Sequence, residues 1–191
     1  DLCFWSLVPL VMAPAFIVTG IFIHQVELLN NKNWSKEWFA LCFIVYAFSH
    51  LKSSLIIGSL VDKYSGEKLI QYFILPMFLG ITLLALPINH QLITAAFMFL
   101  IGATVGSAGP IVGSLWVEIY GNKNIGAIRS MVTSIMVIST AISPVLMGWL
   151  FDNHHTYQQV MVYLLVYQGI AWLLLKLYTL KKVNQRRESN I

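Results

Sequence analysis

The chain has 191 residues, of which 58% are hydrophobic and 10% are charged, and its formal net charge is +4. A soluble domain usually carries about 25% charged residues, so this composition excludes a soluble globular surface and disfavours disorder, a disulfide scaffold and a basic nucleic-acid module. Charged residues are missing from five long stretches: 2–26, 38–51, 69–117, 130–151 and 153–175. Since a spanning helix needs about 20 consecutive apolar residues, the sequence predicts an all-α, polytopic membrane protein.

Six spanning helices are predicted, approximately over 3–24, 38–61, 69–88, 92–117, 126–151 and 159–180. As one helix, the stretch 69–117 would be about 70 Å long, twice the thickness of a bilayer. We therefore expect a break at the polar, proline-bearing segment 87–91. Residues 1–180 then form one transmembrane domain, in which residues 25–37 are a polar loop, and residues 181–191 form a basic tail.

The distribution of positive charge orients these helices. With six spans, both termini lie on one side, together with nine of the cations, whereas Lys32 and Lys36 lie on the other side. The positive-inside rule therefore predicts that both termini are cytoplasmic. The cations are scattered over loops close to the membrane, which argues for the bilayer and against nucleic acid as a partner. We interpret the basic tail as a topogenic or lipid-headgroup contact, with a specific lipid or partner site as the alternative.

Two polar residues, His24 and Gln25, end the first predicted helix near the outer face. They either line an outer vestibule or are plain interfacial residues.

The second predicted helix carries Lys52, about 15 Å from its cytoplasmic end at 1.5 Å per residue. A lysine near the centre of a span costs about 2.5–3.5 kcal/mol on insertion scales. Lys52 therefore indicates a water-filled cavity where it attracts an anion or takes part in proton coupling; snorkelling and pairing with an acid outside this chain are the alternatives. Tyr46 and His50 share another stripe of this helix, where His50 either carries a coupling proton or is a hydrogen-bonded structural histidine.

Four glycines of the fourth predicted helix, Gly102, Gly106, Gly109 and Gly113, fall within about 60° of one another on a helical projection. Such a smooth face favours close helix packing, and a flexible gating helix is the alternative. On the opposite side, the hydroxyl of Ser107 either contacts substrate or bonds back to the preceding turn of its own helix.

The fifth predicted helix has a polar line formed by Arg129, Thr133 and Thr140, which we expect to face the bundle or a cavity. Arg129 lies at the cytoplasmic start of this helix, within loop reach of Glu118. The pair forms either a structural ion pair or interfacial anchor, or a cytoplasmic gate or anion contact.

The loop between the second and third predicted helices reads GSLVDKYSGEKL over residues 58–69. It resembles motif A of the major facilitator superfamily, G-x-L-x-D-[RK]-x-G-x-[RK]-[RK]. Gly58, Asp62, Lys63 and Lys68 match the motif, as does Leu60. The loop departs from it at Ser65, where glycine is usual, and at Glu67, where a basic residue is usual, as is common in the second copy of the motif. An ordinary topogenic loop is the alternative.

Further segments extend this resemblance over nearly the whole chain. Residues 116–121, 126–130 and 143–152 look like helices ten and eleven of a bacterial transporter of this family, while residues 19–25 are similar to helix seven. Thr19, at the start of that segment, is a further candidate for the substrate cavity. The resemblance implies the C-terminal six-helix half of a twelve-helix secondary transporter in the bacterial inner (plasma) membrane. Such folds alternate access to a midplane small-molecule site between two halves. Asp1 then looks like the cut edge of a longer chain, and the N-terminal half is the expected partner.

The substrate class rests on Lys52 alone, which favours a small organic anion with proton coupling. A half-transporter or a non-transporting scaffold that acts as a homodimer is the alternative function. A rhomboid-like intramembrane protease would need Gly-x-Ser-Gly and a later intramembrane histidine, whereas residues 106–109 read Gly-Ser-Ala-Gly. No HExxH motif or pair of intramembrane aspartates occurs. We therefore expect no enzyme activity, no cofactor and no metal site.

Overall fold

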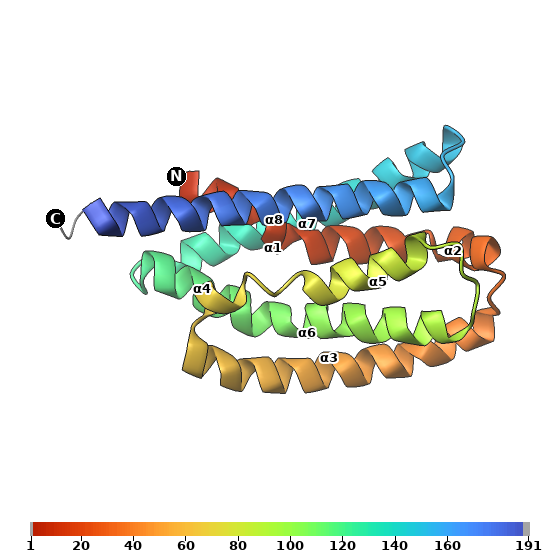
Figure 1. Ribbon diagram of the computed structural model, residues 1–191, viewed down its shortest axis with the longest axis horizontal. Helices are drawn as coiled ribbons and strands as arrows, with labels where there is room; N and C mark the ends of the chain where they lie inside the picture. The colour runs from red at the N-terminus through yellow and green to blue at the C-terminus, as the bar shows by residue number, and fades with distance from the viewer. Residues whose placement is uncertain (1, 189–191) are drawn as a thin grey trace.

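A computed structural model describes the backbone of residues 2–188 and the side chains of residues 3–179. This part of the chain folds into eight helices and contains no strand. Five of the helices are long and apolar enough to cross a membrane: Cys3–Ile23, Lys36–Tyr64, Leu92–Tyr120, Ile125–Asp152 and Tyr157–Thr179. They lie roughly side by side, and the first helix, α1 (Leu2–Ile23), begins at the end of the bundle where the last helix, α8 (Tyr157–Glu188), ends (Figure 1).

The first helix covers almost the same residues as the first expected helix, and a short second helix occupies the first part of the expected polar loop. α1 (Leu2–Ile23) is followed directly by α2 (Gln25–Lys32), so the prediction of a loop over 25–37 is wrong for its first eight residues. α2 buries Leu28, Leu29 and Lys32. It ends at Asn33, which adopts a left-handed conformation and whose N–H bonds to the Asn30 carbonyl. The burial of Leu28 and Leu29 explains why this largely polar segment forms a helix.

The third predicted span is interrupted. α3 (Lys36–Tyr64) leads into α4 (Gly66–Leu69), a run of turns follows, and α5 extends only over Leu75–Ala85. Pro76 has no N–H to donate to the preceding turn, which explains why the expected continuous helix over 69–88 is wrong. The segment from α4 to α5 nevertheless runs along most of the length of α6 (Figure 1).

The remaining helices agree closely with the predicted spans. They are α6 (Leu92–Tyr120), α7 (Ile125–Asp152) and α8 (Tyr157–Glu188). α8 continues through most of the expected basic tail, whose last residues, 189–191, and all of whose side chains lie outside the described part of the chain.

The core lies between α1, α5, α6 and α8. In their apolar windows, 50% of the α1 residues and 44% of the α6 residues are buried, but only 11% of those in α3 and 17% of those in α7. α3 packs mainly on α6, and α7 packs mainly on α1. Both α3 and α7 therefore leave most of their surface uncovered by the chain.

The α3–α6 contact depends on glycine. A Cβ atom on Gly102 would lie 2.6 Å from the Tyr46 carbonyl oxygen, and one on Gly106 would lie 2.2 Å from that of His50. Small residues allow helix backbones to approach this closely in lipid. A Cβ atom on Gly109 would meet no atom within 4 Å. Of the four glycines, only Gly102 and Gly106 therefore pack against α3.

At the opposite end of the bundle from the termini, side chains hold the loop between α5 and α6 by its carbonyl groups. Lys32 Nζ donates to the carbonyl oxygens of Leu86 (2.5 Å) and Ile88 (3.3 Å), and it is fully buried. The indole N–H groups of Trp34 and Trp38 donate to the carbonyls of Asn89 and Gln91. We call these three side chains, Lys32, Trp34 and Trp38, the carbonyl clamp. Its donors bond to the carbonyl of Leu86, which directly follows α5, and to further carbonyls along the loop up to the start of α6.

Candidate functional site

The loop that resembles motif A is docked onto the end of α6 by Glu118. The Glu118 carboxylate accepts hydrogen bonds from the backbone N–H groups of Gly66 (2.7 Å) and Glu67 (3.0 Å), and the Ser114 hydroxyl also donates to it. A carboxylate at the start of a helix is favoured because the first N–H groups there lack intrahelical acceptors. A Cβ on Gly66 would lie 2.8 Å from the Ile111 carbonyl oxygen, so the loop backbone rests directly on α6.

The matched residues of the motif lie on the open side of this loop. Asp62, Lys63 and Lys68 are exposed, and a Cβ on Gly58 would meet no atom within 4 Å. Their side chains are therefore accessible to a partner, while the contacts that fix the loop come from Gly66 and Glu118.

Ser65 has an unusual backbone conformation, with φ of 71° and ψ of 150°. Only glycine adopts this region without strain, and other residues lose about 1–3 kcal/mol there. This is the motif position at which glycine is usual, so the loop geometry explains the glycine of the motif.

We expect Ser65→Gly to stabilise the chain by about 1 kcal/mol, because it removes this strain. Thermal unfolding of the purified protein in detergent would measure the gain. Ser65→Ala retains the Cβ atom and is the matched control, for which no gain is expected. Equal effects of both substitutions would show that the conformation of Ser65 is not strained.

The three candidates on α3 have different environments. Lys52 is exposed, with Nζ 5.8 Å from the centre of the Phe48 ring, and it lies twelve residues before the end of α3 at Tyr64, or about 18 Å at 1.5 Å per residue. Tyr46 and His50 are half-buried, and their ring centres are 6.1 Å apart. The Tyr46 ring also packs against Phe22 of α1. Lys52 thus points away from the core, whereas Tyr46 and His50 lie partly within a helix contact.

His24 connects α1 to α7. Its Nε2 atom lies 2.9 Å from the Pro144 carbonyl oxygen, and its ring packs edge-on against Phe151. Thr19 and Gln25, the other candidates near this end of α1, are half-buried. Ser143, which directly precedes Pro144, donates from its hydroxyl to the Phe16 carbonyl of α1 at 2.5 Å. The structure therefore gives His24 a helix-packing contact.

The three polar residues along α7, Arg129, Thr133 and Thr140, have different environments although their spacing places them on one face. Arg129 donates through one guanidinium nitrogen to the Gly113 carbonyl of α6 at 3.2 Å. Thr133 is exposed, and the Thr140 hydroxyl donates to the Val137 carbonyl of its own helix. Arg129 thus bonds to the backbone of α6, and Glu118 accepts from the backbone of the loop at residues 66–67, while the predicted pairing of Arg129 with Glu118 stays a prediction.

The Ser107 hydroxyl bonds back to the preceding turn of its own helix, which is one of the two alternatives for this residue. Its hydroxyl is buried and donates to the Thr104 carbonyl at 2.8 Å, within α6. This back-bonding is usual for serine in a membrane helix.

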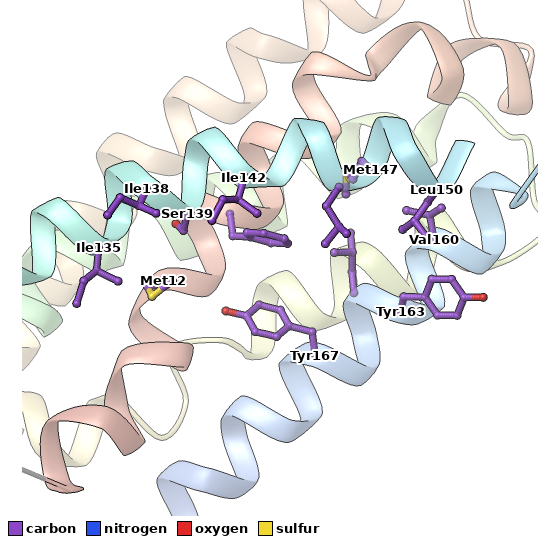
Figure 2. A pocket seen from close by; sticks show the side chains of 13 residues that line it. Met12, Ile135, Ile138, Ser139, Ile142, Met147, Leu150, Val160, Tyr163 and Tyr167 are labelled. Carbon is purple, nitrogen blue, oxygen red and sulfur yellow. The ribbon is translucent and has the colours of Figure 1, made fainter. Parts of the chain in front are cut away.

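An apolar groove of about 360 Å³ lies between α7 and α8, with α1 at its floor (Figure 2). The Tyr167 hydroxyl, which lies at this groove, donates to the Pro9 carbonyl at 2.8 Å. The remaining lining is almost entirely aliphatic, aromatic or thioether side chains. Apolar side chains on this side of the bundle suit contact with lipid.

Several buried polar groups were not singled out from the sequence, among them those of Gln168 and Trp116. The amide of Gln168 in α8 is fully buried and has no hydrogen-bond partner among the described residues, and the same holds for the indole N–H of Trp116 in α6. In the sequence, Gln168 is one polar residue in an apolar run, and Trp116 belongs to the segment 116–121 that looks like helix ten. Among residues 3–179, whose side chains the structure describes, no cluster of three His, Cys, Asp or Glu residues could hold a metal ion.

The long apolar helices, which pack side by side, define a multi-pass, α-helical integral membrane protein. The family model of the Major Facilitator Superfamily matches residues 5–190. The chain therefore belongs to the Major Facilitator Superfamily, whose members are membrane transporters and not enzymes. None of the curated proteins compared with the chain matches it.

Proposed function

We propose that the chain is the C-terminal half of a secondary transporter, which moves a small organic anion by alternating access and couples this movement to protons. The observation that carries the proposal is the low burial of α3 and α7, 11% and 17% in their apolar windows. Secondary transporters of this kind place their substrate between two rocking halves, and two uncovered helices suit such an interface. The N-terminal half is the partner that would cover them, and the bacterial inner membrane is the location that we assign.

Lys52 supports the anionic substrate class. Lys52 lies far from both ends of α3, a helix that is long enough to span the bilayer. Its side chain is on a face of α3 that the chain leaves exposed. Lysine in such a position is costly unless it faces water or an opposite charge. A water-filled cavity between the halves would provide both hydration and an anion. His50, two residues away, is our candidate for the coupling proton because its ordinary pKa lies near physiological pH.

We expect Lys52→Gln and Lys52→Ala to abolish uptake of the transported anion by cells that express the natural chain, while the amount of protein in the membrane stays unchanged. The reason is the loss of the positive charge that attracts the anion into the cavity. Uptake of a radiolabelled substrate, identified by screening small carboxylates, measures the effect. Lys36→Gln is the matched control, since Lys36 is an exposed lysine at the start of the same helix. Normal uptake by both Lys52 variants would contradict the assigned role of Lys52.

A half-transporter or a scaffold that acts as a homodimer is the second candidate function. The same uncovered faces of α3 and α7 support it, because a second copy would cover them as well. Chemical cross-linking of the natural chain in its membrane distinguishes the two, since only the homodimer gives a cross-linked species of twice the mass of the natural chain.

A further inference from the structure

A cavity of about 340 Å³ lies between α1, α6 and α7 and is separate from the groove of Figure 2. Its walls include Val11 of α1, Val112 of α6 and Val132 of α7. The polar side chains in its lining are Trp116, Arg129 and Thr133, and no carboxylate lines it. The volume is at the lower end of the range for small-molecule sites, about 300–1,000 Å³, which are also mostly apolar with few polar groups.

Arg129 brings positive charge to this cavity. One guanidinium nitrogen is bound to the Gly113 carbonyl, which fixes the side chain against α6. A guanidinium group has five N–H donors in a fork that matches a carboxylate, so this single bond leaves donors for a ligand. Thr133 follows four residues later on α7, and residues at this spacing lie on the same face of a helix. Its exposed hydroxyl is thus placed on the side of α7 that carries the guanidinium group.

Trp116 adds an unsatisfied donor. Its side chain is 1% exposed, and its indole N–H has no hydrogen-bond partner among the described residues. A buried polar group without a partner costs about 1–3 kcal/mol, and an indole nitrogen can act only as a donor. The ring is fixed in place by packing against Phe4 and Tyr120. The indole nitrogen itself is buried, so an acceptor atom of a ligand reaches this N–H group only when the neighbouring side chains move slightly.

We propose that this cavity binds an organic carboxylate with a compact apolar body. Arg129 binds the carboxylate, Thr133 and the Trp116 indole N–H supply further donors, and the valine walls contact the apolar part. This inference rests on the proposed transport of a small organic anion and adds a second point of contact, on α6 and α7, to that of Lys52 on α3. The shared property of the three polar groups is that all can donate hydrogen bonds, which selects an anion over a neutral or cationic molecule of the same shape.

Benzoate is a suitable probe because it combines a carboxylate with a small apolar ring. We expect equilibrium dialysis of radiolabelled benzoate against the purified natural chain in detergent to show saturable binding. Benzamide, a neutral molecule of the same shape, should compete at least tenfold less well. Arg129→Gln should weaken benzoate binding at least tenfold, whereas Lys123→Gln, which removes an exposed cation from the neighbouring loop, should leave it unchanged.

A second variant separates loss of binding from loss of folding. Trp116→Phe keeps an aromatic ring against Phe4 and Tyr120 but removes the N–H donor, so it should weaken benzoate binding several-fold with little change in thermal stability. The inference is overturned if the natural chain does not bind benzoate, or if Arg129→Gln and Trp116→Phe both bind it as the natural chain does. Proton-driven uptake of another solute without benzoate binding would overturn only this inference. Benzoate binding without uptake of any solute would overturn the proposed function and leave the binding site standing.

Discussion

Gly106→Ala should destabilise the protein by at least about 3 kcal/mol, because the added Cβ would lie 2.2 Å from the His50 carbonyl oxygen and 2.9 Å from the His50 carbonyl carbon. Both neighbours are backbone atoms, so no side chain can rotate to make space. α3 would have to move away from α6 along its most extensive contact.

Gly109→Ala provides the matched control for this prediction. Gly109 lies in the same helix and on the same stripe, but a Cβ there meets no atom within 4 Å. Alanine favours the helix over glycine by up to about 1 kcal/mol, so this variant should be neutral or slightly stabilised. Thermal unfolding in detergent and the yield of monodisperse protein measure both variants. Equal stability of the two would mean that α3 and α6 do not approach as closely as described.

Lys32→Met should destabilise the protein by about 3 kcal/mol, because the carbonyls of Leu86 and Ile88 lose a charged donor, and hydrogen bonds to charged groups contribute about 1.5–3 kcal/mol each. Methionine fills a similar volume, so the loss reflects the missing hydrogen bonds more than a cavity. Lys36→Met is the control, because Lys36 is exposed and surface substitutions usually change stability by less than about 0.5 kcal/mol.

The pH dependence of stability gives an independent check on Lys32. Burial lowers the pKa of Lys32 from its ordinary value of 10.5, so the unfolded chain binds this proton more tightly than the folded chain does. The contribution of Lys32 to the free energy of unfolding therefore rises as the pH rises towards 10.5. This rise should be absent in Lys32→Met and present in Lys36→Met. Identical pH profiles for the two variants would contradict the burial of Lys32.

Periodicity and charge were sufficient to predict the long helices, because an apolar run of this length has few alternatives to a spanning helix. The interruption before α5 was not predicted, although Pro76 is visible in the sequence, since proline is tolerated in membrane helices when neighbours satisfy the freed groups. Pro9 and Pro14 lie inside α1 without ending it. Sequence alone does not distinguish these two outcomes, because tertiary packing decides between them.

The candidate site was predicted less well than the fold. Gly106 and Gly109 are equivalent on a helical projection, and only the position of α3 makes one of them essential. Lys32 was counted as a charge in an outer loop, whereas its burial depends on carbonyls more than fifty residues away. The predicted role of Lys52 remains a prediction, since it depends on groups outside the chain. The positive φ of Ser65 was not predicted either, although it lies at the motif position where glycine is usual.

α7 is attached to the bundle unevenly along its length. Its C-terminal half contacts α1 through Ser143, Met147 and Pro144, and a Cβ on Gly20 would lie within 3 Å of the first two. Its N-terminal half has Val132 as its buried residue and reaches α6 through the long side chain of Arg129. Local opening requires less free energy where fewer buried contacts must break. We therefore expect local opening of α7 to begin at its N-terminal end, while the end that packs on α1 stays in place.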